Sequence, residues 1–194
     1  MGVIIDKSGK SSEQCVLAVQ KANCMLGMIK RNIQFKSKEV IVKLYKSLVR
    51  PRLEYCIQAW SPYLWKDIDM MERVQRRATK LVDGLKNACY EDRLEATGLI
   101  SLEKRRIRGD LIQVFKVMKG IDKIDYKIFF EVSTLGKTRG HSLKLLKKRC
   151  NGELRRNFFS QRVVDVWNGL PQCVVDADSV NSFKTRLDKF DRYF

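Results

Sequence analysis

Basic side chains recur on one side of a helix that the sequence predicts between Asp67 and Leu85. Apolar residues there step by three and four, which places them on one helical face and leaves the basic residues on the remaining surface. The basic residues are Arg73, Arg76, Arg77 and Lys80. Guanidinium and ammonium groups bind phosphate oxygens, so this face predicts contacts with a nucleic-acid backbone. A charged face that is only solvated is the alternative for this helix.

Two further basic stretches follow, one from Lys104 to Arg108 and one between residues 137 and 162. Between residues 137 and 162, nine Lys or Arg residues face a single acidic residue, Glu153. Acids are too few there to balance the bases, which favours an anionic partner over a merely solvated surface. The predicted phosphate contacts in the two stretches are Lys104, Arg105, Arg106, Arg108, Lys147, Lys148, Arg149, Arg155 and Arg156. Such contacts release counterions, so binding should tolerate any base sequence and weaken steeply with salt.

No catalytic constellation accompanies these cations. A polymerase or nuclease holds carboxylates around two metal ions about 4 Å apart. The chain contains no Asp-Asp pair, and the pairs Asp67/Asp69 and Asp176/Asp178 have a spacing that diverges on a helix. His141 has no carboxylate beside it in the sequence, which favours a surface position or a phosphate contact over a catalytic base. We therefore predict no catalytic residue, no metal ligand and no cofactor.

The composition supports a folded, basic protein. The 194 residues carry a net charge of +17, and 44% of them are hydrophobic, enough to bury a core. A chain that accepts this self-repulsion usually meets a polyanion, so nucleic acid is the expected partner, with no membrane and no small-molecule substrate. No apolar run approaches the roughly 18 residues of a membrane-spanning helix, and the first residues lack the pattern of a signal peptide.

Six cysteines are scattered without C-x-x-C spacing. Most fall within apolar helical faces, which is typical of reduced, buried thiols in the nucleus or cytosol rather than in a secreted protein. A disulfide framework is the alternative that an even number of cysteines leaves open. The single histidine argues against a zinc finger.

The elements that position the basic residues are mainly helices. Val3, Ile4 and Ile5 predict a short strand without a partner sheet. Capping signals and apolar periodicity then predict a series of helices, with Ser11 and Gln14 forming a capping box and Pro51 interrupting the second helix. The expected helical ranges are 11–32, 37–60, 67–85, 90–96, 101–120, 158–170 and 180–194. Leu143, Leu145 and Leu154 can form a small hairpin across the Asn151-Gly152 turn.

Aromatic residues allow two interpretations. Trp60, Tyr63 and Trp65 flank Pro62 and can stack on bases, but their position at a junction of helices favours packing in that corner. Trp167 lies among valines and is predicted to be in the core. The same is predicted for Phe158 and Phe159.

Several stretches together resemble the C-terminal part of the reverse transcriptases of LINE-type (non-LTR) retrotransposons, in the jockey-like and chicken-repeat-like clades. They occur in the family's order and cover nearly the whole chain. The stretches are MGVIID, LYKSLVRPRLEYCIQAWSP, MERVQRRATKLVDGL, SLEKRRIRGDLIQVFKVMKG, TRGHSLKL, FFSQRVVDVWNGLPQCVV and SVNSFKTRLDKF. Each stretch alone is weak evidence for the family, but the whole series in this order is specific to it.

The resemblance implies a position within such an enzyme. Residues 1–10 are similar to the last strand beside the palm, residues 11–132 to the helical thumb, and residues 133–194 to a basic C-terminal extension. In that family the thumb holds the template–primer duplex by its backbone, which implies phosphate contacts at the basic residues named above from Arg73 to Arg108. The palm with its Tyr-x-Asp-Asp carboxylates has no counterpart in this sequence.

The expected fold class is therefore mainly α, a thumb-like helical bundle between a short orphan strand and a basic α-rich C-terminal module. The expected function is that of a truncated fragment of an RNA-directed DNA polymerase that binds the backbone of RNA, DNA or their hybrid and is no enzyme by itself. The alternative is a structural or protein-interaction domain that docks on a palm domain or on another partner.

Overall fold

The computed structural model describes residues 2–7, 9–133 and 140–190. This part of the chain is mainly helical, and it contains no strand, only an isolated antiparallel bridge between Val132 and Leu145. No helix in it combines the length and the apolar composition needed to cross a membrane. The chain divides into two compact units, residues 1–106 and 107–194, and the division falls within one long helix. The predicted domain boundaries at 10/11 and 132/133 remain predictions.

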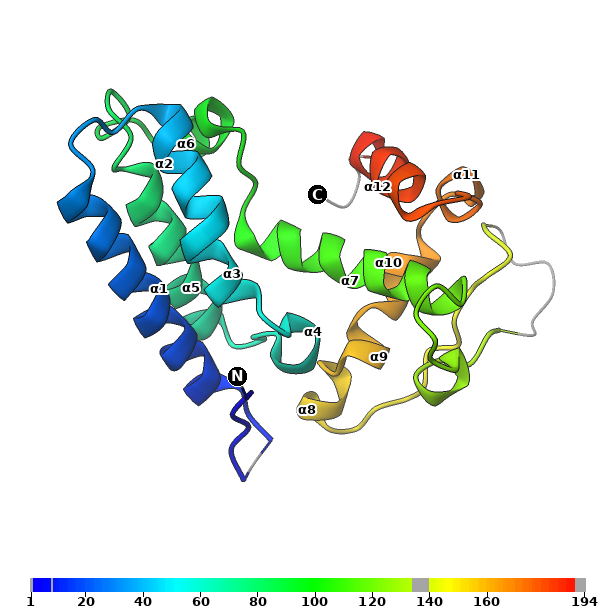
Figure 1. The fold of residues 1–194 in the computed structure, drawn as a ribbon. Coiled ribbons are helices and arrows are strands. Elements are labelled where there is room, and N and C mark those ends of the chain that lie inside the picture. Colours follow the sequence, from blue (N-terminus) through cyan, green and yellow to red (C-terminus); the bar gives the residue numbers. More distant parts are fainter. Residues whose placement is uncertain (1, 8, 134–139, 191–194) are drawn as a thin grey trace. The chain divides into compact units, whose positions relative to one another are not determined.

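The first unit is a helical bundle (Figure 1). Its elements are α1 (Ser12–Asn32), α2 (Lys38–Leu44), the π-helical turn η1 (Tyr45–Val49), α3 (Arg50–Glu54), α4 (Ile57–Trp60), α5 (Trp65–Thr79) and α6 (Tyr90–Thr97). Helix α1 packs against α5, α3 and η1 through an apolar stripe that includes Cys15, Ala18, Ala22 and Leu26. Small side chains in the stripe let the helices approach closely. The second predicted helix contributes Ile41, Tyr45 and Val49 to this core, whereas its Val40 and Leu48 are exposed.

Pro51 interrupts the second predicted helix, and a π-helical turn precedes it. The backbone N–H of Arg50 bonds to the carbonyl of Tyr45, five residues earlier, and this wider turn closes the π-helical segment before α3 begins. Pro51 lies in the first turn of α3, where its missing N–H costs nothing. Cys56 then adopts a left-handed conformation with φ of 51°, and α4 follows as the predicted second segment.

A buried polar network fixes the centre of the first unit. Gln75 of α5 is fully buried, and its side chain accepts a hydrogen bond from the hydroxyl of Tyr45 at 2.8 Å. Its amide nitrogen donates to Tyr90 Oη at 2.9 Å and to the carbonyl of Ile100 at 3.0 Å. Glu72 joins the network by accepting from Tyr90 Oη and from the backbone N–H of Leu102. These hydrogen bonds connect η1, α5, α6 and the segment from Ile100 to Leu102.

The long helix α7 (Leu102–Met118) carries the division between the units. The second unit continues with the 3₁₀ turn η2 (Tyr126–Ile128), α8 (Glu153–Arg156), α9 (Phe159–Arg162), α10 (Val164–Asn168), α11 (Gln172–Val175) and α12 (Val180–Lys189). Its core centres on Trp167, Phe115 and Phe183, and the two phenylalanine rings stack with centroids 4.3 Å apart. Ser179 caps α12, whose predicted range begins at the next residue, by accepting a hydrogen bond from the N–H of Ser182.

Several expectations about elements were wrong. Val3, Ile4 and Ile5 form no strand; instead Gln14 binds the N–H of Ile4, so that Ser11 and Gln14 form no capping box. The hairpin is absent, because Leu145 bridges to Val132 while Leu154 lies in α8. The helix expected over 158–170 is two short helices, α9 and α10. Residues 134–139 and 191–194, where parts of the basic stretch 137–162 and of the last predicted helix fall, lie outside the described residues.

Candidate nucleic-acid interface

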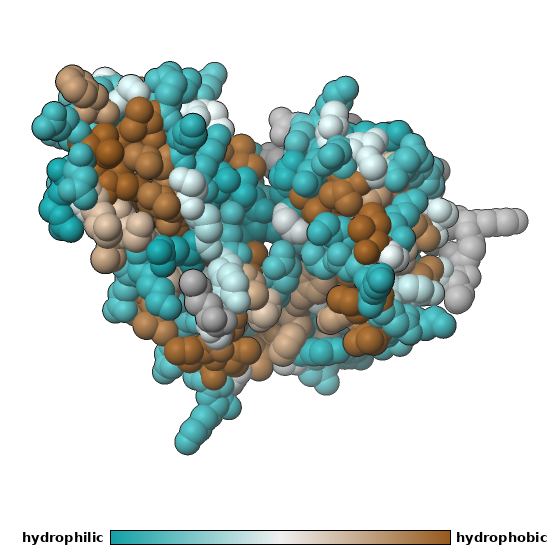
Figure 2. Space-filling model, viewed as in Figure 1, coloured by the Kyte–Doolittle hydropathy of each residue, from teal (hydrophilic) through white to brown (hydrophobic). Residues whose placement is uncertain are grey.

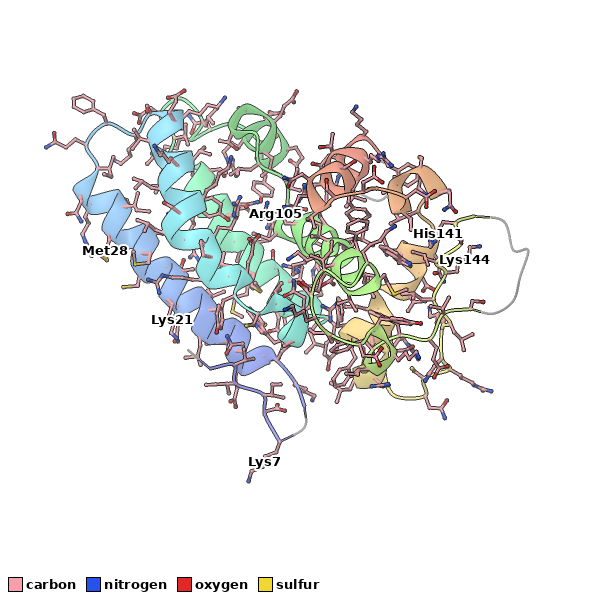
Figure 3. The ribbon with its side chains drawn as sticks, turned by 45° about the vertical axis from the view of Figure 1, so that its right-hand side comes forward. Lys7, Lys21, Met28, Arg105, His141 and Lys144 are labelled. Atoms are coloured by element: carbon pink, nitrogen blue, oxygen red, sulfur yellow. The ribbon has the colours of Figure 1, made fainter. Side chains whose placement is uncertain are left out.

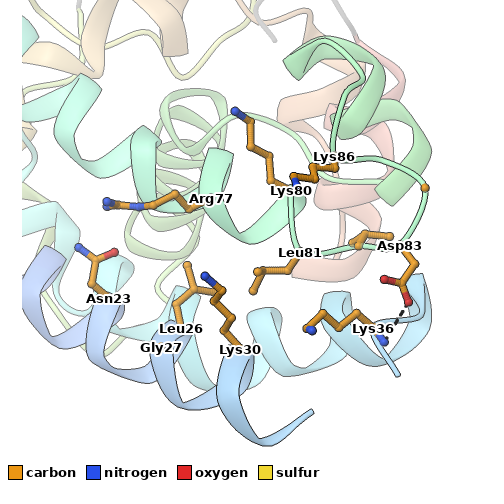
Figure 4. A pocket seen from close by; sticks show the side chains of 12 residues that line it. Asn23, Leu26, Gly27, Lys30, Lys36, Arg77, Lys80, Leu81, Asp83 and Lys86 are labelled. Carbon is orange, nitrogen blue, oxygen red and sulfur yellow. Dashed lines mark hydrogen bonds between the residues drawn. The ribbon is translucent and has the colours of Figure 1, made fainter. Parts of the chain in front are cut away.

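A pocket of about 830 Å³ in the first unit gathers basic side chains from three segments (Figure 4). We call it the cationic pocket. It is lined by Asn23, Leu26, Gly27, Lys30, Lys36, Arg77, Lys80, Leu81, Val82, Asp83, Gly84 and Lys86. Five of these residues are basic and one is acidic. Arg77 and Lys80 were predicted to contact phosphate, and the pocket places both in one concave site.

Helix α1 supplies one wall of the pocket. Asn23, Gly27 and Lys30 are spaced by four and three residues, so they share a helical face beside the buried stripe. Gly27 is unusual in the interior of a helix, where glycine is about 1 kcal/mol less favourable than alanine. A Cβ added there would meet only Nη1 of Arg31, at 3.9 Å. The missing side chain therefore leaves open space on this wall.

The opposite wall is the end of α5 and the turn that follows it. The helix was predicted to reach Leu85 but ends at Thr79, because the N–H of Asp83 bonds to the carbonyl of Lys36 at 3.0 Å rather than to a carbonyl of α5. Gly84 then takes a positive φ of 82°, which glycine adopts without strain. The turn that results brings Lys80 and Lys86 to the pocket.

Lys36 and Asp83 join the two walls. The carboxylate of Asp83 accepts a hydrogen bond from the backbone N–H of Lys36 at 3.1 Å, drawn as a dashed line in Figure 4. Together with the bond from the N–H of Asp83 to the Lys36 carbonyl, this makes a reciprocal pair between the α1–α2 loop and the turn after α5. The only acidic residue of the pocket is thus bound to backbone, and no ion pair to the ammonium groups of Lys30, Lys36, Lys80 or Lys86 is formed within the described residues.

Arg73 and Arg76 lie on the same helix but differ from Arg77. Asp69 binds both, with N–O distances of 2.7 Å to Arg73 and 3.0 Å to Arg76. Arg76 also lies over the ring of Tyr90, 5.1 Å from its centroid. Their side chains are 67% and 45% exposed, so they remain accessible to phosphate, although a ligand must compete with Asp69.

Most basic residues at the start of α7 are already bound to carboxylates or buried. Arg105 makes a bidentate ion pair with Glu54 at 2.5 and 3.0 Å, and this hydrogen bonding raises the pKa of the guanidinium. Arg106 is buried. Within the second unit, Arg108 makes a bidentate pair with Asp188 at 2.7 and 2.9 Å. Of the four predicted contacts in this run, only Lys104 is exposed without such a partner in the part of the chain that the structure describes.

The predicted cations near the C-terminus fall into a smaller group. Lys147, Lys148, Arg149 and Arg156 line a pocket of about 300 Å³ together with Cys150 and Gln161. Asp165 binds Lys147 and Glu131 binds Lys148, which leaves Arg149 and Arg156 as its exposed cations without a described ion pair. Arg155 does not line this pocket and lies over the ring of Phe158 at 5.7 Å.

His141 was expected at the surface or on a phosphate, and that expectation was wrong. The residue is 3% exposed, and its Nε2 donates to the carbonyl of Trp167 at 2.9 Å while the two rings meet edge to face. Burial lowers the pKa of the imidazole, and the nearby Lys144 lowers it further (Figure 3). A neutral imidazole held against a tryptophan is a core residue.

The aromatic predictions held only in part. Trp60 is buried as predicted and donates its indole N–H to the Tyr55 carbonyl at 2.7 Å, and Trp167 is fully buried. Trp65, expected to pack in the same corner as Trp60, is 75% exposed at the start of α5. Phe158, expected in the core, is 48% exposed.

The pocket contains residues that the sequence did not single out. Lys30, Lys36, Lys86 and Asn23 line it but were not predicted as binding residues. Lys36 and Lys86 lie outside helices, so no periodicity marked them. Gly27 within an otherwise regular helix was the one available signal. No group of His, Cys, Asp and Glu suited to a metal ion occurs in residues 2–7, 9–133 and 140–190.

Comparison with known proteins assigns nothing to these residues. No family model matches the chain, and neither does any curated protein or any solved structure. The candidate interface thus rests on the geometry and charge of this chain. The resemblance to reverse transcriptases rests on the sequence stretches alone.

Proposed function

We propose that this chain binds the phosphate backbone of nucleic acid through the cationic pocket, as the thumb-like part of a non-LTR retrotransposon reverse transcriptase. The observation that supports the proposal is the gathering of Lys30, Lys36, Arg77, Lys80 and Lys86 around one acidic residue that is already hydrogen-bonded to backbone. Cations without intramolecular partners attract a polyanion most strongly, because no ion pair has to be broken on binding.

Neighbouring cations extend the surface. Arg73 and Arg76 precede Arg77 on α5 and remain accessible despite their pairing with Asp69. The proposal omits Arg105, Arg106 and Arg108, whose guanidinium groups are paired or buried. It assigns no cofactor and no catalytic step to the chain, since the sequence holds no Tyr-x-Asp-Asp carboxylates. A palm domain supplied separately would have to perform any polymerisation.

The test is binding of a fluorescent RNA–DNA hybrid by anisotropy at increasing salt. The triple variant Lys30→Gln/Arg77→Gln/Lys80→Gln removes three pocket charges, and Lys21→Gln/Lys43→Gln/Lys46→Gln removes three exposed charges of the same unit outside the pocket. Each lost phosphate contact should reduce the slope of log K against log salt by about 0.9. The pocket variant should lose about 2 to 3 from this slope, and the control far less. Equal losses in both variants would reduce the proposal to a general charge effect.

A second candidate function is docking on a protein partner. Figure 2 shows hydrophobic surface over α1 and α2, and the exposed apolar residues include Phe35 at 84% and Trp65 at 75%. A contiguous apolar patch on a surface is typical of an interaction site, whereas single exposed apolar residues are common on any protein. Size-exclusion chromatography with light scattering tests this candidate, because a strict monomer that binds no purified palm domain would count against it.

A further inference from the structure

We infer that the cationic pocket takes an unpaired nucleotide of a single strand, with its phosphates at the basic rim and its base on the apolar floor. The inference rests on the proposed function and specifies what the pocket binds. A flat basic surface would suit any backbone, but a concave pocket of about 830 Å³ lies in the size range of sites that enclose a small ligand.

The floor of the pocket differs chemically from its rim. Leu26, Leu81 and Val82 line the pocket together with the bare backbone of Gly27, and none of them can bind a phosphate. The ammonium groups of Lys30, Lys36 and Lys80 come from different segments around this floor (Figure 4). A ligand that satisfies both parts carries an anionic group next to a flat, weakly polar group. A nucleotide has this combination.

Gly27 is what keeps the floor open. It lies in the middle of α1, where glycine is the least favourable residue apart from proline, and no heavy atom except Arg31 Nη1 would meet a Cβ there. A larger side chain would project into the free volume of the pocket. The sequence thus keeps space at this point at a cost in helix stability.

Two polar side chains can recognise the edge of a base. Asn23 of α1 and Arg77 of α5 both line the pocket (Figure 4). An amide offers both a donor and an acceptor, and a guanidinium plane can hydrogen-bond or stack on a base. Among the described residues no aromatic side chain lines the pocket, so stacking falls to Arg77 and to the aliphatic floor. Preference among the four bases should therefore be weak.

A duplex can use the rim but not the floor. Paired bases lie inside the helical stack and reach a protein pocket only after unstacking and unpairing. An unpaired strand pays no such cost and can turn a base toward the protein. The pocket should thus distinguish single strands from duplexes that carry the same number of phosphates.

The experiment compares three ligands of equal phosphate count with the unmodified protein: a single-stranded 12-mer, the same strand with abasic sites, and a hairpin duplex. We expect the intact single strand to bind about fivefold tighter than the abasic strand, the effect of removing roughly 40 Å² of apolar base surface from water on the floor. Equal binding of intact and abasic strands overturns the inference but leaves the proposed function standing, provided that binding still falls with salt. Absence of salt-dependent binding to all three overturns the proposed function itself.

A substitution at Gly27 tests whether the preference for the intact strand arises in the cationic pocket. Gly27→Leu fills the floor without changing any charge, and Met28→Leu on the exposed neighbouring position is the matched control. Gly27→Leu should abolish the preference for the intact strand over the abasic strand and keep the salt-dependent binding of the duplex. A preference that survives in a folded Gly27→Leu protein places the base elsewhere. Photo-crosslinking of a 4-thiouridine strand to the unmodified protein provides a second readout. Crosslinks are expected at residues 23–30, 36 or 77–86, and the inference is rejected if they fall only outside these positions.

Discussion

Lys36 and Asp83, 47 residues apart in sequence, exchange two hydrogen bonds, and both residues line the cationic pocket. The backbone N–H of Lys36 donates to the carboxylate of Asp83, and the N–H of Asp83 donates to the carbonyl of Lys36. This pair ends α5 and fixes the position of the turn that carries Lys80 and Lys86. It also means that the pocket's one negative charge has a structural role.

Substitution at Asp83 should separate charge from geometry. Asp83→Asn keeps an oxygen that accepts from Lys36 and removes the negative charge, so nucleic-acid binding at low salt should strengthen by about two- to fivefold, as expected for a surface charge interaction of roughly 1 kcal/mol or less. Asp83→Ala removes the acceptor as well and should gain less or lose affinity. Anisotropy titrations of both variants check this. Identical affinities for the two would mean that the hydrogen bond does not shape the pocket.

Gln75 should be among the most sensitive positions for stability. Gln75→Met keeps the volume but leaves the hydroxyls of Tyr45 and Tyr90 and the carbonyl of Ile100 without this partner inside the core. We expect a loss of about 2–4 kcal/mol in the free energy of unfolding, because buried polar groups without partners are costly. Tyr45→Phe removes one bond of the same network and should cost about 1 kcal/mol. Urea denaturation measures both, and a Gln75→Met protein as stable as the original would contradict the role given to the network.

His141 should make the second unit less stable in acid. Its pKa is lowered in the folded state by burial and by Lys144, against a smaller opposing effect of Asp176 and the bond to Trp167. A base whose folded pKa lies below its unfolded value binds more protons when unfolded, so its stability is fully present above the ordinary pKa of 6.5 and declines as the pH falls below it. Thermal unfolding between pH 7.5 and pH 5 should show this decline. His141→Gln, which can still donate to the Trp167 carbonyl, should have a flatter profile over the same range.

Thiol reactivity should divide the cysteines by burial. The six cysteines are free; Cys15 is fully buried, and Cys24, Cys56, Cys89 and Cys173 are exposed, which corrects the prediction that most are buried. Burial, with Asp67 as the second cause, raises the pKa of Cys15 from 9.0 to about 12. A thiol reagent at pH 8 should label the exposed cysteines of the native protein and spare Cys15 until urea is added. Mass spectrometry of the labelled peptides identifies the sites, and early labelling of Cys15 would show that the core of α1 opens.

Local sequence signals predicted the ends of helices well where the residues that begin or end the helix belong to the same segment. Helix α6 ends at Gly98 in a left-handed conformation, close to its predicted end, and α12 begins at its Ser179 cap. Errors arose where a distant partner intervened. Gln14 binds Ile4 rather than capping its own helix, and Asp83 binds Lys36 rather than continuing α5. In each case a tertiary hydrogen bond competed successfully with a local one.

The residues of the candidate site likewise divide into those that local sequence signals identified and those that only the tertiary structure brought together. Arg77 and Lys80 could be named from helical periodicity, but Lys36 and Lys86 come from irregular segments that only folding brings beside α1. Conversely, Arg105 looked equivalent to Arg77 in the sequence. The structure pairs it with Glu54, which lies 51 residues earlier.

The sequence by itself determined that this chain is helical, strongly basic and without the carboxylate pairs of a polymerase, because helical periodicity, net charge and residue types are properties of the chain before it folds. Tertiary structure alone decided which cations are available to a ligand. Arg105 and Arg108 are each held in a bidentate ion pair, and the acids that bind them lie 51 and 80 residues away along the chain. The same folding brought five cations to one pocket, none of them in an ion pair among the described residues, and left its floor open at Gly27.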